Sequence, residues 1–576
     1  MRYSRKRGVT LIDTLVGSAL MLVVFLGIAA AFELSVEVVS NNKARAGAIA
    51  LANERMEYLK SLTYPQIGVE GGIPAGNVPQ LESVTLNGVS YTRRIFVAYT
   101  DDPKDGLGAA DTNAIVADFK TIRVETSWIS KQGERSVALI GRVSPTGVET
   151  AVPGGVLTII VVDANDIPFQ NAQVQIVNAS TSPIINITTY TGEDGTISFI
   201  GAPAASNYQI VVSKTGYSTA QTYPATTQNP NPTPRHLTVV NDQTTSSTFA
   251  IDLLASKNIL TYKQIVPVSW TDPFTNDSLI ATSSAITISG GEVTLAGANP
   301  YETSGFLESV AITSSILAGW NALAWTDTTP TQTDIRYRVY DATSGSAALI
   351  SDAELPGNGV GFSTSPINLS GLSTSTYRAL AVRAELSTTD TSVTPSLQQL
   401  EVSYDFGPEP FPNFTFTMRG NKTIGNSPTV YKYDTYLTSN SSSQVSLGGI
   451  EWDTYTIGVT STSTYEIAEA CGPQPETLQP GGIQTSSIYV LPATSHSLLV
   501  DVRDSAGALV PGASVRLTRT GYDETEMTSS CGQSFFSGLT STVYSIDVTK
   551  AGYQSNTTSG LTVSGDTKLS IVLQSL

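Results

Sequence analysis

The chain has 576 residues, with 47 glycines, 29 prolines and only 14% charged residues, and it is too long for a single hydrophobic core. This composition favours several domains of short strands joined by turns, so we expect a mainly β fold. The formal net charge of −17 at pH 7 would repel a phosphate backbone, which excludes a nucleic acid as the main partner.

The first predicted element is a membrane helix. Arg5, Lys6 and Arg7 precede an apolar stretch from Leu15 to Phe32, which is long enough to cross most of the hydrocarbon of a bilayer. The basic flank should stay on the cytoplasmic side, with the bulk of the chain outside the cell membrane. Asp13 lies at the start of the apolar stretch, where an ionised carboxylate is costly and needs a partner.

The predicted helix continues beyond the membrane, over residues 9–62. This range contains no proline, and apolar residues recur three or four positions apart on one face: Ile49, Ala52, Met56, Leu59 and Leu62. Tyr64-Pro65 should end the helix. We therefore expect a helix that is half embedded in the membrane and half packed on a small globular head.

The N-terminal run Arg-Lys-Arg-Gly8-Val9-Thr-Leu-Ile-Asp13 resembles the signal of type IV prepilins and type II secretion pseudopilins. The resemblance implies that prepilin peptidase cuts after Gly8, which makes residues 1–8 a leader peptide, and methylates the new N-terminus at Val9. It also implies that Asp13, at a place where the family usually has Glu, neutralises the terminal amine of a neighbouring subunit in the filament. The family usually has Phe where this chain has Val9. An uncleaved signal anchor and a secretory signal peptide cut near residues 29–31 are the alternatives, and the continuing helix disfavours the second.

Residues 63–150 should form a small antiparallel sheet, because short alternating segments occur at 84–86, 90–97, 120–128 and 137–143. Together with Arg55-Met56-Glu57, Asp118-Phe-Lys120 and Trp128, this region resembles the α+β head of minor pseudopilins. Four carboxylates crowd one glycine-containing loop of it: Asp101, Asp102, Asp105 and Asp111. Converging carboxylates can bind Ca²⁺ through hard oxygen ligands, and the alternative is a solvated acidic turn.

Two segments, 151–258 and 495–576, look like copies of one module. Each has a strand around a tyrosine, Tyr208 and Tyr544, followed by Lys214-Thr-Gly-Tyr in the first copy and Lys550-Ala-Gly-Tyr in the second. Both resemble the carboxypeptidase regulatory-like or transthyretin-like β-sandwich, a domain without catalytic residues. Residues 408–494 look like a more divergent third copy, with Tyr455 at the place of the other two tyrosines.

Residues 259–407 form a different predicted unit, a jelly-roll or lectin-like sandwich with Trp270, Trp320 and Trp325. Exposed tryptophans in such a fold could stack on a sugar, whereas tryptophans are more often part of a core. Only two cysteines occur, Cys471 and Cys531, and an even count in an exported chain favours one disulfide between adjacent modules. The alternative is that each thiol is buried in its own module.

We expect no enzymatic activity. The only histidines, His236 and His496, stand outside any metalloprotease or triad-like motif, and the chain has no GxSxG or Walker sequence. The predicted function is a minor pilin or pseudopilin-like structural subunit of a surface or secretion filament, with the membrane, prepilin peptidase and other pilin or pseudopilin subunits as partners. The alternative is a membrane-anchored surface adhesin or carbohydrate-binding protein. A surface glycan or protein is the hypothetical ligand of the tail, and Ca²⁺ is the candidate cofactor.

Overall fold

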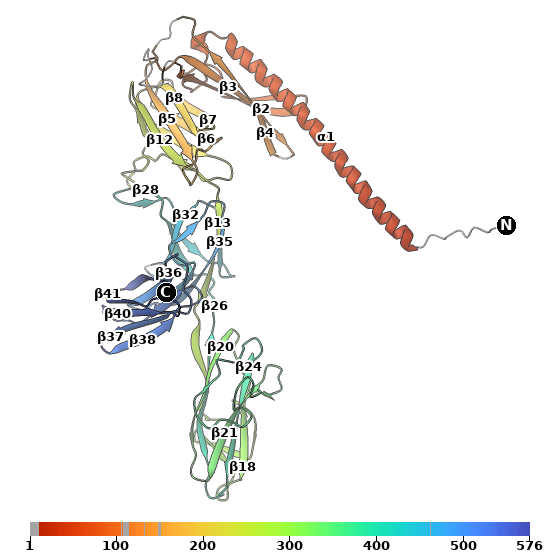
Figure 1. Cartoon of the computed structure of the whole chain (residues 1–576), viewed down its shortest axis with the longest axis vertical. Helices are drawn as coiled ribbons and strands as arrows, with labels where there is room; N and C mark the ends of the chain where they lie inside the picture. Colours follow the sequence, from red (N-terminus) through yellow and green to blue (C-terminus); the bar gives the residue numbers. More distant parts are fainter. Residues whose placement is uncertain (1–10, 105, 107–114, 132, 148–150, 461) are drawn as a thin grey trace, which may run out of the picture.

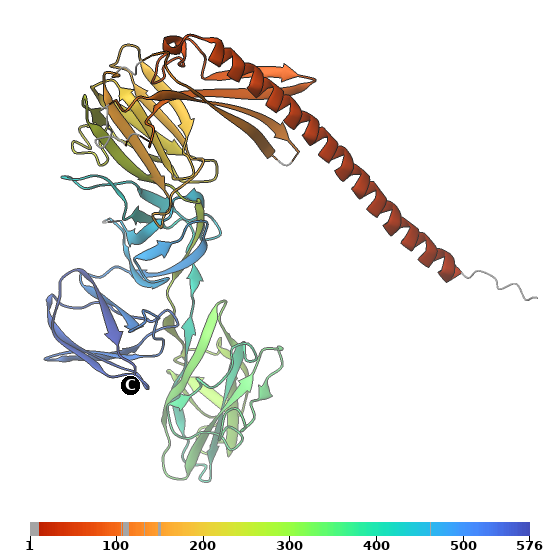
Figure 2. The same ribbon diagram turned by 45° about the horizontal axis from the view of Figure 1, so that its top comes forward.

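The structure, a computed structural model, describes residues 11–104, 106, 115–131, 133–147, 151–460 and 462–576. A long helix leaves a small sheet at one end of the molecule, and the β-sandwiches follow one another away from that sheet (Figure 1). The view in Figure 2 shows the same arrangement, with the green sandwich at the end remote from the sheet. The blue C-terminal sandwich lies to one side of the row that the other sandwiches form. The prediction of a mainly β chain with one long N-terminal helix is confirmed.

The N-terminal part of the described chain is one long helix followed by a four-stranded sheet, which we call the head sheet. Helix α1 (Leu11–Ser61) is followed by the 3-10 turn η1 (Tyr64–Gln66), as the proline at position 65 requires. The head sheet is antiparallel in the order β1-β2-β3-β4, with the bounds Leu81–Leu86, Val89–Thr100, Phe119–Ser130 and Gly133–Val143.

The face of α1 that meets the sheet differs in part from the predicted one. Ala52, Met56 and Leu59 are buried as expected, whereas Ile49 is 37% exposed. The buried stripe instead extends N-terminally through Ala44, Ala48 and Leu51. Tyr91 explains the small residues, because its hydroxyl donates to the Ala44 carbonyl at 3.0 Å and a Cβ added at Gly47 would lie 2.5 Å from that hydroxyl oxygen.

The first sandwich (residues 155–251) and the terminal sandwich (residues 497–573) share one topology. In each, the first strand pairs in parallel with the last strand and antiparallel with the fourth. The second strand pairs with the third and the fifth in the opposing sheet. The first sandwich comprises β5 (Gly155–Val162), β6 (Gln173–Asn178), β7 (Ile185–Tyr190), β8 (Thr196–Ala202), β9 (Ala205–Ser213), β10 (Ala220–Gln221), β11 (Leu237–Val239) and β12 (Thr244–Ala250). The terminal sandwich comprises β36 (Ser497–Asp504), β37 (Ser514–Arg519), β38 (Tyr522–Met527), β39 (Gln533–Phe536), β40 (Thr542–Thr549), β41 (Asn556–Val563) and β42 (Asp566–Leu573).

A third sandwich of the same topology is split in the sequence, and we call it the split sandwich (residues 255–263 and 409–492). Its first strand, β13 (Ala255–Lys263), pairs in parallel with its last strand, β35 (Ile483–Pro492), and antiparallel with β31 (Gln444–Ile450). Its other strands are β26 (Glu409–Pro410), β27 (Thr415–Gly420), β28 (Thr423–Gly425), β29 (Val430–Tyr431), β30 (Asp434–Thr438), β32 (Asp453–Val459), β33 (Tyr465–Cys471) and β34 (Glu476–Leu478). The predicted boundary between residues 258 and 259 therefore cuts β13 in two. It has to be moved, because the whole strand hydrogen-bonds into the sheet of residues 409–492.

The remaining sandwich is an insertion between β13 and β26, and we call it the inserted sandwich (residues 266–406). Its two six-stranded sheets enclose a core that contains Trp320 and Trp325. Its strands are β14 (Val266–Asp272), β15 (Ile280–Ser284), β16 (Ile286–Ser289), β17 (Glu292–Leu295), β18 (Ser304–Ser309), β19 (Ile312–Thr313), β20 (Leu317–Thr328), β21 (Thr333–Asp341), β22 (Ala348–Leu349), β23 (Ile367–Asn368), β24 (Ala379–Thr388) and β25 (Ser396–Phe406). The entering and leaving chains run side by side as antiparallel pairs, β13 with β26 and then β14 with β25.

Candidate functional site

The N-terminal part of α1 is an exposed apolar surface. Most of its side chains between Leu15 and Val39 are large and apolar, with exposed fractions such as 75% for Met21 and 72% for Phe25. By length and composition this helix can cross a membrane. Glu33, the first charged residue after the membrane-length apolar stretch, has its carboxylate 3.2 Å from the Lys131 ammonium at the tip of the β3–β4 hairpin. The head therefore reaches α1 before the exposed apolar surface ends at Val39.

The C-terminal part of α1 is fixed to the head by ion pairs as well as by its buried stripe. Arg93 of β2 donates to the Leu51 carbonyl at 3.1 Å and pairs with Glu82 of β1 at 2.6 Å. Arg55 of α1 pairs with the same Glu82 carboxylate. Because Arg93 and Glu82 are largely shielded from solvent, these contacts hold helix and sheet in one orientation.

Lys120 is a buried ammonium, a role that was not predicted from the sequence. Its Nζ donates to the carbonyls of Tyr64 and Ile67 at 2.8 and 2.7 Å, which ties β3 to the segment just after α1. Burial lowers the pKa of Lys120 to about 8. Its position, two residues before Ile122 and four before Val124 on the inward face of β3, was the signal in the sequence that could have revealed it.

The predicted processing and assembly residues fall at the edge of the described chain. Gly8 and Val9 lie outside the described residues, and Asp13 lies in the first turn of α1. Their roles in cleavage and assembly therefore stay predictions.

Two of the four predicted calcium ligands, Asp105 and Asp111, also lie outside the described residues. Of the other two, Asp102 accepts a hydrogen bond from the backbone amide of Lys104 at 3.3 Å. The backbone amide of Asp102 in turn donates to the Asp118 carboxylate at 2.5 Å. These bonds order the start of the loop, and calcium binding stays a prediction.

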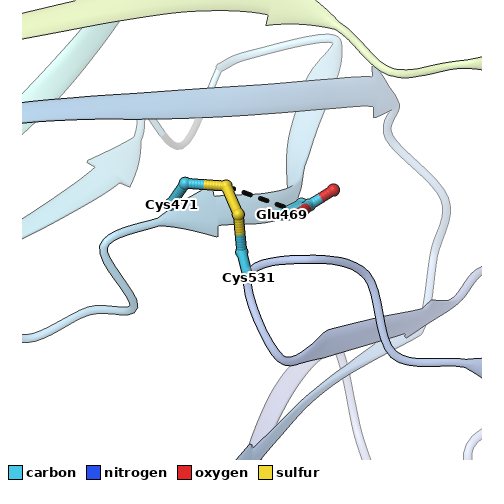
Figure 3. A group of neighbouring side chains, drawn as sticks. All are labelled: Glu469, Cys471 and Cys531. Carbon is cyan, nitrogen blue, oxygen red and sulfur yellow. Dashed lines mark hydrogen bonds between the residues drawn. A yellow bond between two sulfur atoms is a disulfide. The ribbon is translucent and has the colours of Figure 1, made fainter. Parts of the chain in front are cut away.

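Cys471 and Cys531 form a disulfide with Cα atoms 5.2 Å apart, which joins the split sandwich to the terminal sandwich. Figure 3 shows the bond between β33 and the loop before β39, with Glu469 beside it. Two further contacts cross the same junction: Ser529 donates to the Glu469 carboxylate at 2.5 Å, and the amide of Ala470 donates to the Gln533 side chain at 2.7 Å. We call these five side chains, Cys471, Cys531, Glu469, Ser529 and Gln533, the clamp.

The clamp is not a metal centre, although Glu469 and the two cysteines cluster closely enough to suggest one. Both sulfur atoms are used in the disulfide, so no thiolate is present to bind a metal. Burial raises the pKa of Glu469, and the hydrogen bond from Ser529 opposes this shift. The junction is therefore a structural fastening between two sandwiches.

The three related sandwiches share a buried tyrosine at the predicted place. Tyr208 donates to the Pro203 carbonyl at 2.6 Å, Tyr455 to the Glu451 carbonyl at 2.7 Å and Tyr544 to the Thr540 carbonyl at 3.3 Å. Each ring is at most 1% exposed. A hydroxyl that satisfies a loop carbonyl a few residues upstream fixes the entry into the central strand.

The two histidines and the tryptophans of the inserted sandwich take up structural positions. His236 accepts or donates one hydrogen bond with the Thr222 hydroxyl at 2.9 Å, and burial lowers its pKa. His496 lies in the connection between the split and terminal sandwiches, where its carbonyl accepts a bond from Leu539. Trp320 and Trp325 lie in the core of the inserted sandwich and Trp270 packs against that core, so the first two are not placed to stack on a sugar.

Comparisons with known proteins find a family match for one segment of the chain. Residues 497–574 match the family model of the carboxypeptidase regulatory-like domain, and no curated protein matches the sequence. Solved structures that resemble the chain include the TIE protein of Bacillus anthracis, with 10% identity, 87% of this chain and 74% of that chain covered, and a TM-score of 0.16. They also include the major pilin subunit BcpA of Bacillus cereus, with 12% identity, 73% and 100% coverage, and a TM-score of 0.13. The minor pilin GBS52 of Streptococcus agalactiae has 15% identity, 30% and 87% coverage, and a TM-score of 0.13.

TM-scores this low do not favour one function over another. The chain is a β-rich protein with an N-terminal apolar helix that is long enough to cross a membrane. Its terminal sandwich is similar to the carboxypeptidase regulatory-like domain.

Proposed function

We propose that this chain is a minor pilin or pseudopilin-like subunit of a surface or secretion filament. The observation that carries the proposal is the division of one continuous helix into two environments. The N-terminal part of α1 exposes its apolar side chains, whereas its C-terminal part packs on a four-stranded sheet. In a helix of this kind, one end packs against lipid or neighbouring helices, and the other end packs against its own head.

The exposed surface needs a partner for energetic reasons. Burying one large apolar side chain gains roughly 1.5–3 kcal/mol, and α1 exposes many of them in succession. A membrane provides that environment before assembly, and the helices of other subunits provide it inside a filament. Cleavage after Gly8 and pairing of Asp13 with a neighbouring N-terminus would give the helices a fixed stagger in the filament.

The size of the tail supports a minor or tip position. The first, split, inserted and terminal sandwiches extend away from the head (Figure 1), and packing one such tail on every subunit of a thin filament would cause clashes. The role of this tail is display without catalysis. A membrane-anchored surface adhesin is the alternative, and it shares the display function without cleavage or assembly.

The residue at the N-terminus of the mature protein distinguishes a filament subunit from an uncleaved membrane-anchored adhesin. We expect mass spectrometry of filaments sheared from cells to find a chain that begins with methylated Val9, and retained Met1 would contradict the proposal.

Asp13→Ala should insert into the membrane and be cleaved but fail to enter filaments, because only the assembled state needs the carboxylate. Asp13→Glu is the matched control, and it should assemble because it keeps the charge. Normal incorporation of Asp13→Ala would remove the assembly role.

A further inference from the structure

A lysine lies inside the split sandwich where its neighbours are core residues. Lys257 is the third residue of β13, and it alternates with Ala255 and Ile259 on the inward face of that strand. Its side chain is 0% exposed. A buried ammonium is costly unless its hydrogen-bonding groups are satisfied, so its surroundings need an explanation.

Three oxygen atoms surround the Lys257 nitrogen. Nζ lies 2.7 Å from Glu476 Oε2, 2.7 Å from Gln484 Oε1 and 2.7 Å from Ser486 Oγ. Gln484 and Ser486 lie on the neighbouring parallel strand β35, where Gln484 is the register partner of Lys257. Glu476 comes from β34 in the opposing sheet, so the group spans the sandwich.

The arrangement contains the three parts of an acyl-transfer reaction. The lysine amine is a nucleophile, and burial lowers its pKa, which increases its neutral fraction. The side-chain amide of Gln484 is the electrophile, and its carbonyl carbon lies within about 3.9 Å of Nζ because a C=O bond is about 1.23 Å long. The Glu476 carboxylate touches the same nitrogen and is placed to accept its proton.

The site is also shielded and oriented. Glu476 is 14% exposed, and a Cβ at Gly472 would contact its carboxylate, so the glycine backbone lies close over this group. The Gln484 amide nitrogen donates to the Thr477 carbonyl at 3.3 Å, which leaves the amide oxygen directed at Lys257. Low polarity around a positioned pair favours the neutral amine and raises its effective concentration at the amide.

We propose that Lys257 and Gln484 become joined by an intramolecular amide bond in the folded protein. The neutral Lys257 Nζ attacks Gln484 Cδ, and Glu476 accepts the proton that the nitrogen loses. The bond from Cδ to Nε2 then breaks, Glu476 returns the proton to the leaving nitrogen, and one ammonia molecule departs. The reaction is redox-neutral and needs no co-reactant.

The position of the bond gives it a mechanical role. It joins the first strand of the split sandwich to the last strand, across 227 residues of sequence. Because β13 leads back to the head and β35 leads on to the terminal sandwich, tension between those two units would pass through the bond. The inserted sandwich, which lies between Lys257 and Gln484 in the sequence, would then lie outside the path of the tension. This inference does not depend on assembly into a filament.

Intact-mass spectrometry of the full chain, purified in detergent and reduced, tests the proposal directly. We expect a mass lower than that of the chain by one ammonia molecule, and a branched tryptic peptide that contains uncleaved Lys257 and Gln484. Glu476→Gln should restore the full mass, because it keeps the side chain's shape but removes the proton acceptor. Lys263→Met is the matched control, since Lys263 lies on the same strand but pairs with Glu409 at the partly exposed end of β13, and it should keep the mass loss.

The wild-type measurement decides the question even if a variant fails to fold. Folded wild-type protein of full mass, with separate peptides for Lys257 and Gln484, would overturn the proposal. Loss of one water with a branch to Glu476 would overturn it as well, because the carboxylate would then be the electrophile.

Discussion

Replacing Cys531 with serine should loosen the terminal sandwich from the split sandwich. The two cysteines are separated by 60 residues, and the chain-entropy estimate for closing a loop of that size is about 4 kcal/mol. The hydrogen bonds of the clamp from Ser529 to Glu469 and from Ala470 to Gln533 remain in the variant, and each contributes about 1 kcal/mol. We therefore expect destabilisation by about 3–4 kcal/mol with the two sandwiches still in contact.

Hydrogen exchange of the full chain under increasing denaturant measures this loss in the region concerned. Amides of β36 and β39, next to the clamp, should become exchangeable at lower denaturant, whereas amides of the first sandwich should not change. Cys471→Ser and reduced wild-type protein are the controls, and both should match Cys531→Ser because all three lack the same bond. A loss below about 1 kcal/mol, or a wild type insensitive to reduction, would refute the conclusion that the disulfide fastens the terminal sandwich to the split sandwich, given the range measured for native disulfides.

Three further changes test other parts of the structure. Lys120→Met should destabilise the head by about 2–4 kcal/mol, because the buried carbonyl of Ile67 and the part-buried carbonyl of Tyr64 lose their donor. Since the folded pKa of Lys120 is about 8 and its ordinary value is 10.5, the unfolded chain binds more protons between these values. The free energy of unfolding of the wild-type protein should therefore increase as the pH rises across that window. The denaturant midpoint of Lys120→Met should not show this increase. Tyr455→Phe should cost about 1 kcal/mol in thermal unfolding of the split sandwich, because the Glu451 carbonyl loses its partner, and an unchanged midpoint would contradict the role of the hydroxyl. If the acidic loop of the head binds Ca²⁺, calcium should raise the melting temperature of the head and Asp102→Asn should reduce that increase, whereas identical melting with and without calcium would exclude the site.

Much of the architecture could be predicted from local sequence patterns. The apolar run and the absence of proline determine a long helix, and alternating segments with frequent turns determine the β-sandwiches. The equivalence of Tyr208, Tyr455 and Tyr544 was also visible in the sequence, because each stands in a similar order of strands and turns. Local patterns were less informative about α1, where Ile49 was predicted to be buried and is exposed. Close packing against Tyr91 favours alanine and glycine at this face, and the spacing of large apolar residues does not indicate such positions.

Only the tertiary structure determined which strands belong together. The sequence of β13 is that of an ordinary alternating strand, and its pairing with β35 depends on contacts across more than two hundred residues of chain. For that reason the boundary at residue 258 was misplaced and the insertion was not predicted. The same long-range pairing brings Lys257 to Gln484 and Glu476, and the packing of two sandwiches brings Cys471 to Cys531. Residue types and spacing determine helices and strands because the interactions that form these elements are local. A site built from distant strands forms only when those strands pair in the folded protein.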